Sequence, residues 1–268
     1  MARTALITGA SAGIGLATAD RLAGSGWTVV GASRRGSGSP HWSPLVMDVD
    51  DDASVESGVA SVLSEHGRLD AVVACAGWGL AGAVEATPIA EARAQLETNF
   101  FGAVRVVAAA LGPMREAGGG RIVLVSSLGG LIGLPFQAFY SASKFAMEGY
   151  AEALAYEVAP FGIGVTLVEP GNVRTEFTAR RRAVSSEDPD ASAAYEQAAK
   201  RALDKMAEDE RGGAEASTVA ACVERVLSSS RPPRRVGVGK PGERAGTFAK
   251  RLMPYRLFER AARSSLGL

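Results

Sequence analysis

TALITGASAGIG, at residues 4–15, is a short apolar run followed at once by a glycine loop and the start of a helical segment. The spacing is G-x-x-x-G-x-G, whereas the common dinucleotide-binding fingerprint is G-x-G-x-x-G, but the physical roles are the same. Gly9 permits a tight turn, Gly13 lets the backbone approach a pyrophosphate, and Gly15 allows the helix to pack closely on the strand.

The first turn of the expected helix completes this phosphate site, because its free N–H groups face the anion. A strand–helix turn can also contain glycines without binding a ligand, so the loop alone leaves both interpretations open. Its position directly after the first strand favours a nucleotide site, with further backbone contacts from Ser11, Ala12 and Ile14.

Short β-branched runs alternate with Ala-rich segments along most of the chain. Strands are expected at residues 4–8, 28–33, 69–76, 121–127 and 164–170, and helices at 13–24, 52–66, 88–117 and 140–160. Each strand is nearly continuous in apolar residues, which is typical of strands that are buried on both faces of a parallel sheet. The alternation predicts one α/β domain over residues 1–268, a doubly wound parallel sheet with helices on both faces and the ligand at the carboxyl ends of the strands.

The composition argues against several classes of protein. The chain has 268 residues, and its 29 Lys and Arg residues balance its 29 Asp and Glu residues, whereas a dedicated nucleic-acid-binding protein normally has a basic excess. No run of about 20 apolar residues is present, so no membrane-spanning helix is expected. The sequence enters its first strand without a secretory or transit segment, which predicts a cytoplasmic location.

Cysteine and histidine are too few for a metal or disulfide site. Cys75 and Cys222 are isolated in the sequence, which argues against a disulfide framework. His41 and His66 are the only imidazoles, and neither has Cys or carboxylate residues at ligand spacing. We therefore expect no metal site and no histidine-dependent catalytic triad.

Two segments depart from the alternating pattern after residue 177. Residues 178–213 are polar and charged, and they fit a solvated pair of surface helices or a lid over a substrate site; a lid is our expectation. After a short strand near 234–238, residues 240–268 carry seven basic residues against two acidic ones, with apolar residues between them. This segment, the basic tail, is interpreted as a packed amphipathic segment, with a membrane-surface helix as the alternative.

The end of the second strand distinguishes between dinucleotide cofactors. A free ribose 2′-hydroxyl is usually bound by a carboxylate at this position, whereas a 2′-phosphate is bound by a guanidinium. Ser33 offers a small hydroxyl, and Arg34 and Arg35 offer cations, which favours NADP(H) over NAD(H); two solvated loop arginines are the alternative. Asp48 and Val49 follow the next short strand, where the carboxylate could meet an adenine amino group.

A tyrosine and a lysine lie four residues apart at the start of the helix expected at 140–160. Tyr140 and Lys144 share one helix face, with Cβ atoms about 5–6 Å apart. A lysine cation at ~6 Å interacts with a phenolate by a gross energy of about 3 kcal/mol at an effective dielectric of ~20. We therefore expect Lys144 to lower the pKa of Tyr140 from about 10 to about 8, as suits a general acid–base in hydride transfer. A serine of the pair Ser126-Ser127, at the adjoining strand end, can polarise the substrate oxygen.

Four motifs follow one another along the chain: TGASAGIG, LETNFFG with Asn99, SSLGGLIGLPFQAFYSASK and EPGNVRTEF. In this order they resemble the short-chain dehydrogenase/reductase family over most of residues 3–177. The resemblance implies a one-domain Rossmann-type fold, a nicotinamide cofactor and the oxidoreduction of alcohols and carbonyl compounds.

The resemblance also implies roles for single residues. Tyr140 matches the catalytic acid–base, Lys144 the lysine that holds the ribose, Ser127 the serine that orients the substrate, and Asn99 the asparagine that supports a proton-relay water. The loop that positions the nicotinamide carboxamide is matched by Pro170, Gly171, Val173 and Thr175.

One motif departs from the family pattern. Ala74-Cys75-Ala76-Gly77 stands where the family commonly has N-N-A-G. Ala76 and Gly77 keep the close backbone approach to the cofactor, but both asparagine side chains are lost. This loss puts in question a side-chain bond that stabilises the sheet, and leaves the chemistry untouched. Cys75 is interpreted as a small buried apolar residue rather than a reactive thiol.

The loops near the expected active centre carry apolar candidates for a substrate pocket: Trp78, Leu134, Phe136, Phe139 and Phe177. Packing in the core explains each of them equally well. The stretch 78–101 and the C-terminal third resemble the hydroxysteroid- and retinol-dehydrogenase branch of the family. Together these features predict an NADPH-dependent carbonyl reductase that acts on an apolar ketone or secondary alcohol.

Two alternative functions fit the same motifs. A non-catalytic NADP(H)-binding sensor or scaffold would use the fold without turnover, but it has no need to keep all four catalytic residues. An epimerase or dehydratase would usually have a different glycine spacing. The family resemblance further implies a homo-oligomer, either a dimer or a tetramer, built through the helices around 88–117 and 140–160.

Overall fold

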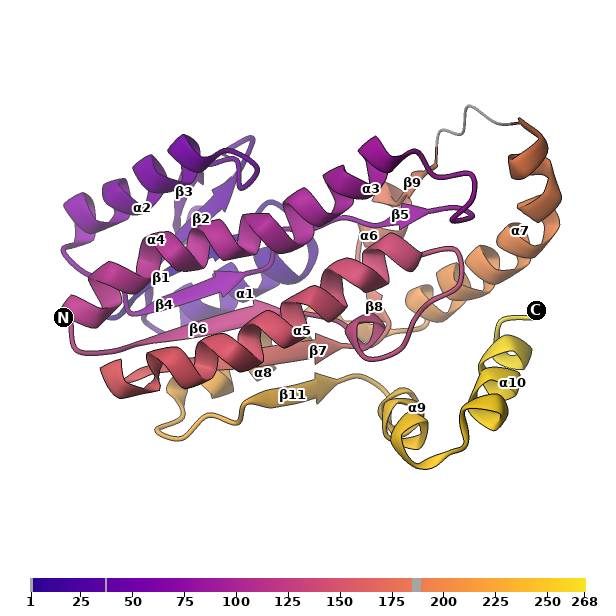
Figure 1. Cartoon of the computed structure of the whole chain (residues 1–268). Helices are drawn as coiled ribbons and strands as arrows, with labels where there is room; N and C mark the ends of the chain where they lie inside the picture. Colours follow the sequence, from indigo (N-terminus) through magenta and orange to yellow (C-terminus); the bar gives the residue numbers. More distant parts are fainter. Residues whose placement is uncertain (1, 37, 185–188) are drawn as a thin grey trace.

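The apolar runs of the sequence form the strands of one parallel sheet (Figure 1). A computed structural model describes residues 2–36, 38–184 and 189–268. The strands of this sheet are β1 (Thr4–Thr8), β2 (Thr28–Ser33), β3 (Ser43–Val46), β4 (Ala71–Ala74), β6 (Gly120–Val125), β7 (Ile163–Pro170) and β11 (Arg235–Val238). Their order is β11-β7-β6-β4-β1-β2-β3, so the direction of winding reverses between β1 and β4.

Helices cover both faces of this sheet, as the alternating pattern predicts. One face carries α2 (Asp52–His66), α4 (Gly102–Glu116) and α5 (Ala138–Val158), and the other carries α1 (Gly13–Gly24) and α8 (Ala216–Ser228). Successive side chains of a strand point to opposite faces. Leu6 is accordingly buried in the core beside α2, α4 and α5, while Ile7 is buried in the core beside α1 and α8. The doubly wound α/β class is therefore confirmed.

The helix expected at 88–117 is interrupted. α3 (Ile89–Leu96) ends before α4 begins, and Glu97–Phe101 form a π-helical turn between them. A π-helical turn contains an extra residue and often occurs at functional sites. β4 is also shorter than the strand expected at 69–76, because the chain leaves the sheet after Ala74 and continues along the edge of the site described below.

Short elements gather at the carboxyl ends of the strands (Figure 1). Two parallel pairs lie there, β5 (Leu80–Ala81) with β9 (Arg182–Ala183) and β8 (Val173–Arg174) with β10 (Ala214–Glu215). The segment 178–213 contains the end of α6 (Phe177–Arg180), β9 and the long helix α7 (Pro189–Arg211), while residues 185–188 lie outside the described residues. The basic tail folds into α9 (Pro241–Leu252) and α10 (Tyr255–Ser265).

The described part of the chain was expected to contain neither a membrane-spanning helix nor a metal site. None of its helices combines the length and the apolar character that crossing a bilayer requires. Among the same residues, no three His, Cys, Asp or Glu side chains are grouped so that they could hold a metal ion.

Candidate active site

A cavity of about 610 Å³ opens at the carboxyl ends of the strands, beside the point where the winding reverses. This is where ligands bind in open α/β sheets. Every residue predicted for catalysis or for the cofactor lines this cavity: Gly9, Ser11, Ala12, Gly13, Ile14, Gly15, Ser33, Arg34, Arg35, Asp48, Val49, Ala76, Gly77, Asn99, Ser127, Tyr140, Lys144, Pro170, Gly171, Val173 and Thr175.

The glycine loop has the close packing that its sequence predicts. Gly9 and Gly13 have φ angles of 69° and 54°, which favour glycine. A Cβ at Gly9 would lie 2.9 Å from the backbone of Ala76, and one at Gly15 would lie 2.3 Å from the carbonyl oxygen of Gly9. The loop therefore brings bare backbone and the start of α1 to the cavity wall, which fits a dinucleotide pyrophosphate.

A threonine ties β1 to the loop after β4, where the family's asparagines are missing. The Thr8 side-chain oxygen accepts hydrogen bonds from the backbone N–H groups of Cys75 at 3.0 Å and Ala76 at 3.1 Å. The strand ends are thus joined without the amide side chains. Burial raises the pKa of the Cys75 thiol to about 11, so this cysteine stays neutral near neutral pH.

The far end of the cavity is lined by two arginines, two aspartates and a buried serine hydroxyl. Arg34 and Arg35 line it, and the buried Ser33 Oγ has no hydrogen-bond partner among the described residues. Asp50 is nearby, but its carboxylate accepts a hydrogen bond from Thr98 at 2.8 Å, and burial raises its pKa. A free hydroxyl beside two guanidinium groups fits the phosphate-bearing ribose of NADP(H).

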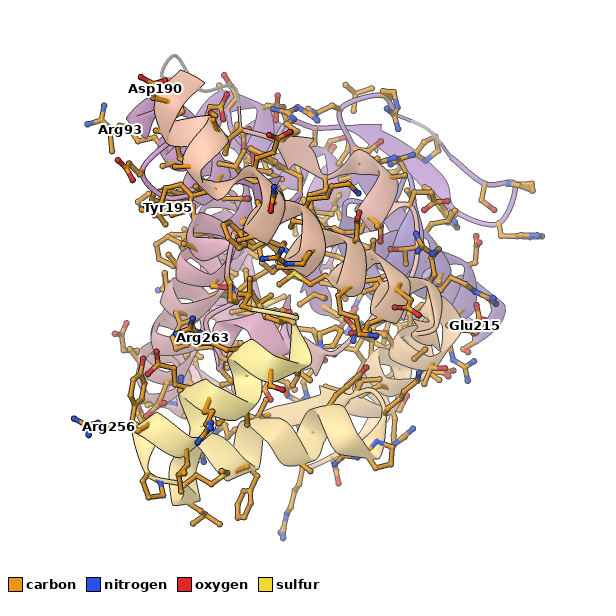
Figure 2. All side chains as sticks on the ribbon, turned by 90° about the vertical axis from the view of Figure 1, so that its right-hand side faces the viewer. Arg93, Asp190, Tyr195, Glu215, Arg256 and Arg263 are labelled. Atoms are coloured by element: carbon orange, nitrogen blue, oxygen red, sulfur yellow. The ribbon has the colours of Figure 1, made fainter. Side chains whose placement is uncertain are left out.

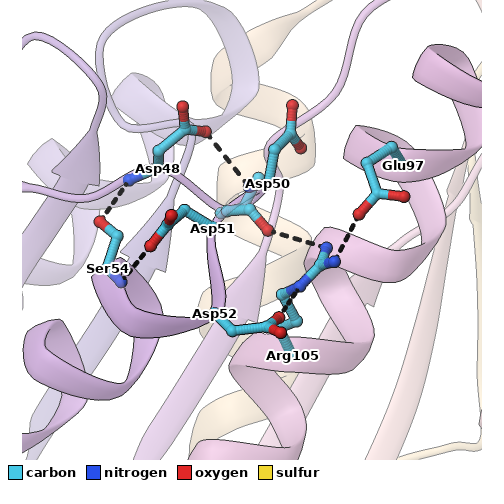
Figure 3. Close-up of polar contacts among 8 residues, drawn as sticks. Asp48, Asp50, Asp51, Asp52, Ser54, Glu97 and Arg105 are labelled. Carbon is cyan, nitrogen blue, oxygen red and sulfur yellow. Dashed lines mark hydrogen bonds and ion pairs between the residues drawn. The ribbon is translucent and has the colours of Figure 1, made fainter.

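Hydrogen bonds hold the backbone of residues 48–50 in place at this end (Figure 3). Ser54 Oγ accepts from the backbone N–H of Asp48 at 3.0 Å. Arg105 of α4 donates to three groups: the Val49 carbonyl at 3.3 Å and the carboxylates of Asp52 and Glu97. The segment that carries Asp48 and Val49 is therefore fixed against α2 and the π-helical turn.

Asn99 lies inside the π-helical turn and is fully buried. Its Nδ2 donates to the carbonyl of Trp78 at 2.9 Å and to Ser143 Oγ at 3.3 Å, and its Oδ1 accepts from the N–H of Trp78 at 3.0 Å. The amide thereby joins the loop after β4 to α5, next to the lysine of the site. In the structure, the direct contacts of Asn99 therefore hold the loop after β4 and α5 in position.

Lys144 is buried at the base of the cavity, where Nζ donates to the Val125 carbonyl at 2.8 Å. Burial lowers the pKa of this lysine to about 8. The pKa of Tyr140 is raised above its ordinary value, chiefly by burial; the Ser127 hydroxyl and Arg181 oppose the rise, and Glu210 adds to it. The expected pKa of about 8 for Tyr140 is therefore wrong for this arrangement, because desolvation outweighs the attraction of nearby cations.

Replacing Lys144 by methionine is expected to stabilise the folded chain by about 2–3 kcal/mol at pH 7. The folded-state pKa of about 8 lies below the unfolded value of 10.5, so the charged lysine opposes folding below pH 8. Between about pH 8 and 10.5 the unfolded chain binds a proton that the folded chain lacks, and the difference falls to roughly half at pH 9.5. Denaturant unfolding of both proteins at pH 7 and 9.5 tests this. An equal difference at both pH values would contradict it.

The apolar candidates for substrate binding separate into two groups. Trp78, Leu134 and Phe177 line the cavity, and the Phe177 ring lies 5.6 Å from the Tyr140 ring, centroid to centroid. Phe136 and Phe139 are not among the lining residues. Phe136 has a φ of 60° and packs on a small alanine cluster outside the cavity: Ala83, Ala86 and Ala191.

The last turns of α7 lie against the substrate end of the cavity. Glu210 lines the cavity, accepts a hydrogen bond from the Thr178 hydroxyl and forms an ion pair with Arg181. The Glu210 and Arg181 side chains are only 15% and 7% exposed. Gln137, also a lining residue, donates to Met206 Sδ of α7 at 3.1 Å. These contacts dock α7 onto the wall of the cavity.

Several polar and charged residues of this wall were not predicted from the sequence. The cavity is also lined by Gln137, Glu176, Arg180, Arg182, Glu210 and Glu243. The Arg182 guanidinium lies over the Trp78 ring, 4.4 Å from its centroid. Arg180, Arg182 and Glu210 come from the polar segment 178–213, which has no periodicity, and only its charge indicated that the site extends there. Gln137 and Glu176 lie inside two of the motifs, but nothing in those motifs distinguishes them as site residues.

The chain is similar to known proteins over most of its length. Residues 3–185 match the model of the family described as short chain dehydrogenase. The chain is 40% identical over 259 residues to a 3-ketodihydrosphingosine reductase of Bacteroides thetaiotaomicron, covering 96% of both chains. It is 36% identical over 255 residues to retinol dehydrogenase 8 of Bos taurus, covering 87% and 80%. A crystal structure of a short-chain dehydrogenase from Streptomyces avermitilis matches with a TM-score of 0.80 and 31% identity over 98% of both chains.

Proposed function

The chain belongs to the short-chain dehydrogenase family, and within it we propose an NADP(H)-dependent reductase of apolar ketones. The observation that carries the proposal is the grouping of Ser127, Tyr140 and Lys144 in one cavity with the glycine loop. The cavity continues past Tyr140 to the aromatic rings of Trp78 and Phe177, which offer an apolar surface next to the acid–base group.

Reduction of a ketone requires a hydride on carbon and a proton on oxygen. When bound, the reduced nicotinamide supplies the hydride. Tyr140 supplies the proton, because burial keeps its phenol protonated near neutral pH. The Ser127 hydroxyl donates a hydrogen bond to the same oxygen and stabilises the negative charge that develops on it. The Lys144 cation favours the phenolate that remains after proton transfer.

NADP(H) is proposed as the cofactor because of the two arginines and the serine at the end of β2. Arg34 and Arg35 can bind a 2′-phosphate, the Ser33 hydroxyl is free to hydrogen-bond it, and Gly9, Gly13 and Gly15 leave room for the pyrophosphate. Pro170, Gly171, Val173 and Thr175 are proposed to hold the carboxamide of the nicotinamide.

Changing Arg34 and Arg35 together to alanine is expected to raise KM for NADPH by about 10–100-fold and to change KM for NADH by less than about threefold. Each charge-assisted hydrogen bond to the phosphate contributes about 1.5–3 kcal/mol, and NADH has no phosphate to lose. Steady-state kinetics with both cofactors measure the effect. Arg68→Ala is a matched control, because Arg68 pairs with Asp70 far from the cavity. Equal losses for both cofactors would contradict 2′-phosphate recognition.

The substrate class is proposed to be a lipophilic ketone or the corresponding secondary alcohol. The Trp78 and Phe177 rings in the cavity support this, and so does the similarity to a 3-ketodihydrosphingosine reductase and a retinol dehydrogenase. A panel of 3-ketodihydrosphingosine, a steroid ketone, retinal and a small water-soluble ketone, followed by the loss of NADPH absorbance, tests the proposal. We expect turnover of at least one long apolar ketone with kcat/KM well above that of the small ketone.

The same panel, combined with a thermal melt, distinguishes the reductase from the sensor or scaffold and from an epimerase or dehydratase. Selective stabilisation by NADPH in a thermal melt, without turnover of any carbonyl compound, would favour the sensor or scaffold. A product formed without net consumption of NADPH would favour an epimerase or dehydratase. Failure to bind either nucleotide would overturn the cofactor proposal as a whole.

Three further proposals concern α7, the oligomeric state and the cellular location. α7 is proposed to act as a lid, supported by its contacts through Glu210 and Met206 at the substrate end. A homo-oligomer is proposed through the π-helical turn, α4 and α5, where Phe101 of the turn and Tyr156 of α5 are 44% and 69% exposed. A cytoplasmic location stays a prediction.

A further inference from the structure

The basic tail, residues 240–268, has an unusual number of exposed apolar side chains. Neither α9 nor α10 contains a fully buried residue. Five large apolar residues are at least one-third exposed where the two helices meet: Phe248, Leu252, Met253, Tyr255 and Leu257. We call this group the apolar corner. Single exposed apolar residues are ordinary, but a contiguous group marks an interaction surface.

The same segment carries most of the asymmetry of charge in the chain. Its seven Lys and Arg and two Glu residues give a net charge of +5, although the whole chain has none. Within the described residues, Arg256, Arg260 and Arg263 of α10 form no ion pair. Figure 2 shows Arg256 projecting away from the ribbon. These cations are free to bind an external anion.

Basic and apolar side chains share the exposed faces of both helices. Residues 244, 248, 251 and 252 of α9 fall on one helix face, which combines Arg244 and Arg251 with two members of the apolar corner. Residues 256, 260 and 263 of α10 fall on one face, with Leu257 on one flank and Glu259 on the other. This combination is typical of helices that lie at the surface of an anionic bilayer, where arginine side chains reach the headgroups while apolar residues enter the boundary.

The apolar corner is fixed relative to the rim of the cavity. At the start of α9, Glu243 lines the cavity beside Gly171 and accepts from Asn172 Nδ2 at 2.9 Å, so α9 begins at the loop proposed to hold the nicotinamide. Further along α9, Lys250 Nζ donates to the Leu131 carbonyl at 2.6 Å and lies 5.1 Å from the Phe145 ring centroid. α9 therefore spans from the cavity rim to the apolar corner as one anchored element.

We propose that the apolar corner and the arginine face of α10 dock on an anionic lipid bilayer, with the cavity rim at the start of α9 near the membrane surface. A second copy of the chain fits less well, because a two-fold symmetric contact would place one +5 tail on another. Docking of this kind would let an apolar substrate pass between bilayer and cavity without crossing water. Binding to the bilayer itself does not depend on the proposed reaction.

Co-sedimentation of the full chain with vesicles tests the proposal without any substrate. We expect binding to phosphatidylcholine vesicles that contain phosphatidylglycerol, weaker binding as salt rises, and little binding to phosphatidylcholine alone. Arg256→Glu, Arg260→Glu and Arg263→Glu together should weaken binding by at least roughly a hundredfold, since each surface cation contributes about fivefold. The control variant carries the same charge change on the exposed Arg93, Arg115 and Arg225. The change in net charge alone weakens binding to anionic vesicles, and the salt dependence of the wild-type protein gives the size of this effect. After correction for it, the control variant should bind within about threefold of the wild-type protein.

A second pair of variants tests the apolar part. Leu252→Ser with Leu257→Ser should weaken vesicle binding by at least tenfold, whereas Val84→Ser with Ile89→Ser, at residues 58% and 63% exposed, should leave it unchanged. All variants should keep their melting temperature and their turnover of a water-soluble ketone. Equal binding of the arginine variant and its control, equal binding to neutral vesicles, or no binding at all would overturn the proposal. A change of solution mass without vesicles in the tail variants would assign the surface to a second copy instead.

Discussion

Replacing Tyr140 by phenylalanine is expected to lower kcat/KM for ketone reduction by about 10²–10⁴-fold while leaving nucleotide binding intact. The change removes only the hydroxyl that donates the proton, and general acid catalysis contributes a factor of this size. The ring stays, so its packing at 5.6 Å from the Phe177 ring is kept and the cavity retains its shape. Steady-state kinetics with the best ketone of the panel give the loss, and fluorescence titration with NADPH gives the affinity.

Tyr150 provides a matched control on the same helix. Its phenol has a pKa that burial raises to about 12, its ring packs edge-on against Phe100 at 6.0 Å, and it does not line the cavity. Tyr150→Phe should therefore change kcat/KM by less than about threefold. If Tyr140→Phe kept more than a tenth of the wild-type kcat/KM, another group would have to supply the proton and the proposed mechanism would fail.

The second large effect is expected at the glycine loop. Gly15→Ala should abolish measurable binding of NADPH and lower the free energy of unfolding by about 2–4 kcal/mol. The new Cβ would lie 2.3 Å from the carbonyl oxygen of Gly9, so either the loop or α1 has to move. Overpacking of this kind costs kilocalories in a tightly packed site. A moved loop no longer presents its backbone to a pyrophosphate.

Gly24→Ala is the matched control at the other end of α1. A Cβ there meets nothing within 4 Å, so the substitution should be neutral or stabilise the chain by up to about 1 kcal/mol through helix propensity. Denaturant unfolding and NADPH titration of both variants measure the two effects. Normal NADPH affinity in a folded Gly15→Ala protein would show that this loop is not the pyrophosphate site.

The fold could be predicted because its strands and helices carry their signals locally. β1, β2 and β7 lie where their continuous apolar runs are, and the burial of both faces of the sheet explains why those runs do not alternate. The π-helical turn at Glu97–Phe101 could not be predicted, since the apolar pattern of the flanking helices continues through it. Nor could the position of α7, which depends on contacts such as Arg181 with Glu210 between segments without periodicity.

The candidate site divides in the same way. Gly15, Tyr140 and Lys144 could be predicted as site residues because each belongs to a motif whose spacing has a physical reason. Their pKa values could not be predicted, because the spacing of Tyr140 and Lys144 along a helix says nothing about desolvation. Desolvation is the largest cause of the pKa shift of both side chains. Likewise, the apolar character of Phe136 does not reveal that its side chain packs on alanines away from the cavity.

The π-helical turn also sets the phase between α3 and α4. One residue of an α-helix corresponds to a rotation of about 100° around the axis, so the extra residue turns everything before it relative to everything after it. If a single residue were removed between Glu97 and Phe101, α3 and α4 could merge into one regular helix, and Asn99 would rotate away from Trp78 and Ser143. Relatives that align across this stretch with a one-residue gap should therefore lack this bridge between the cavity loop and α5, even where every other motif is kept.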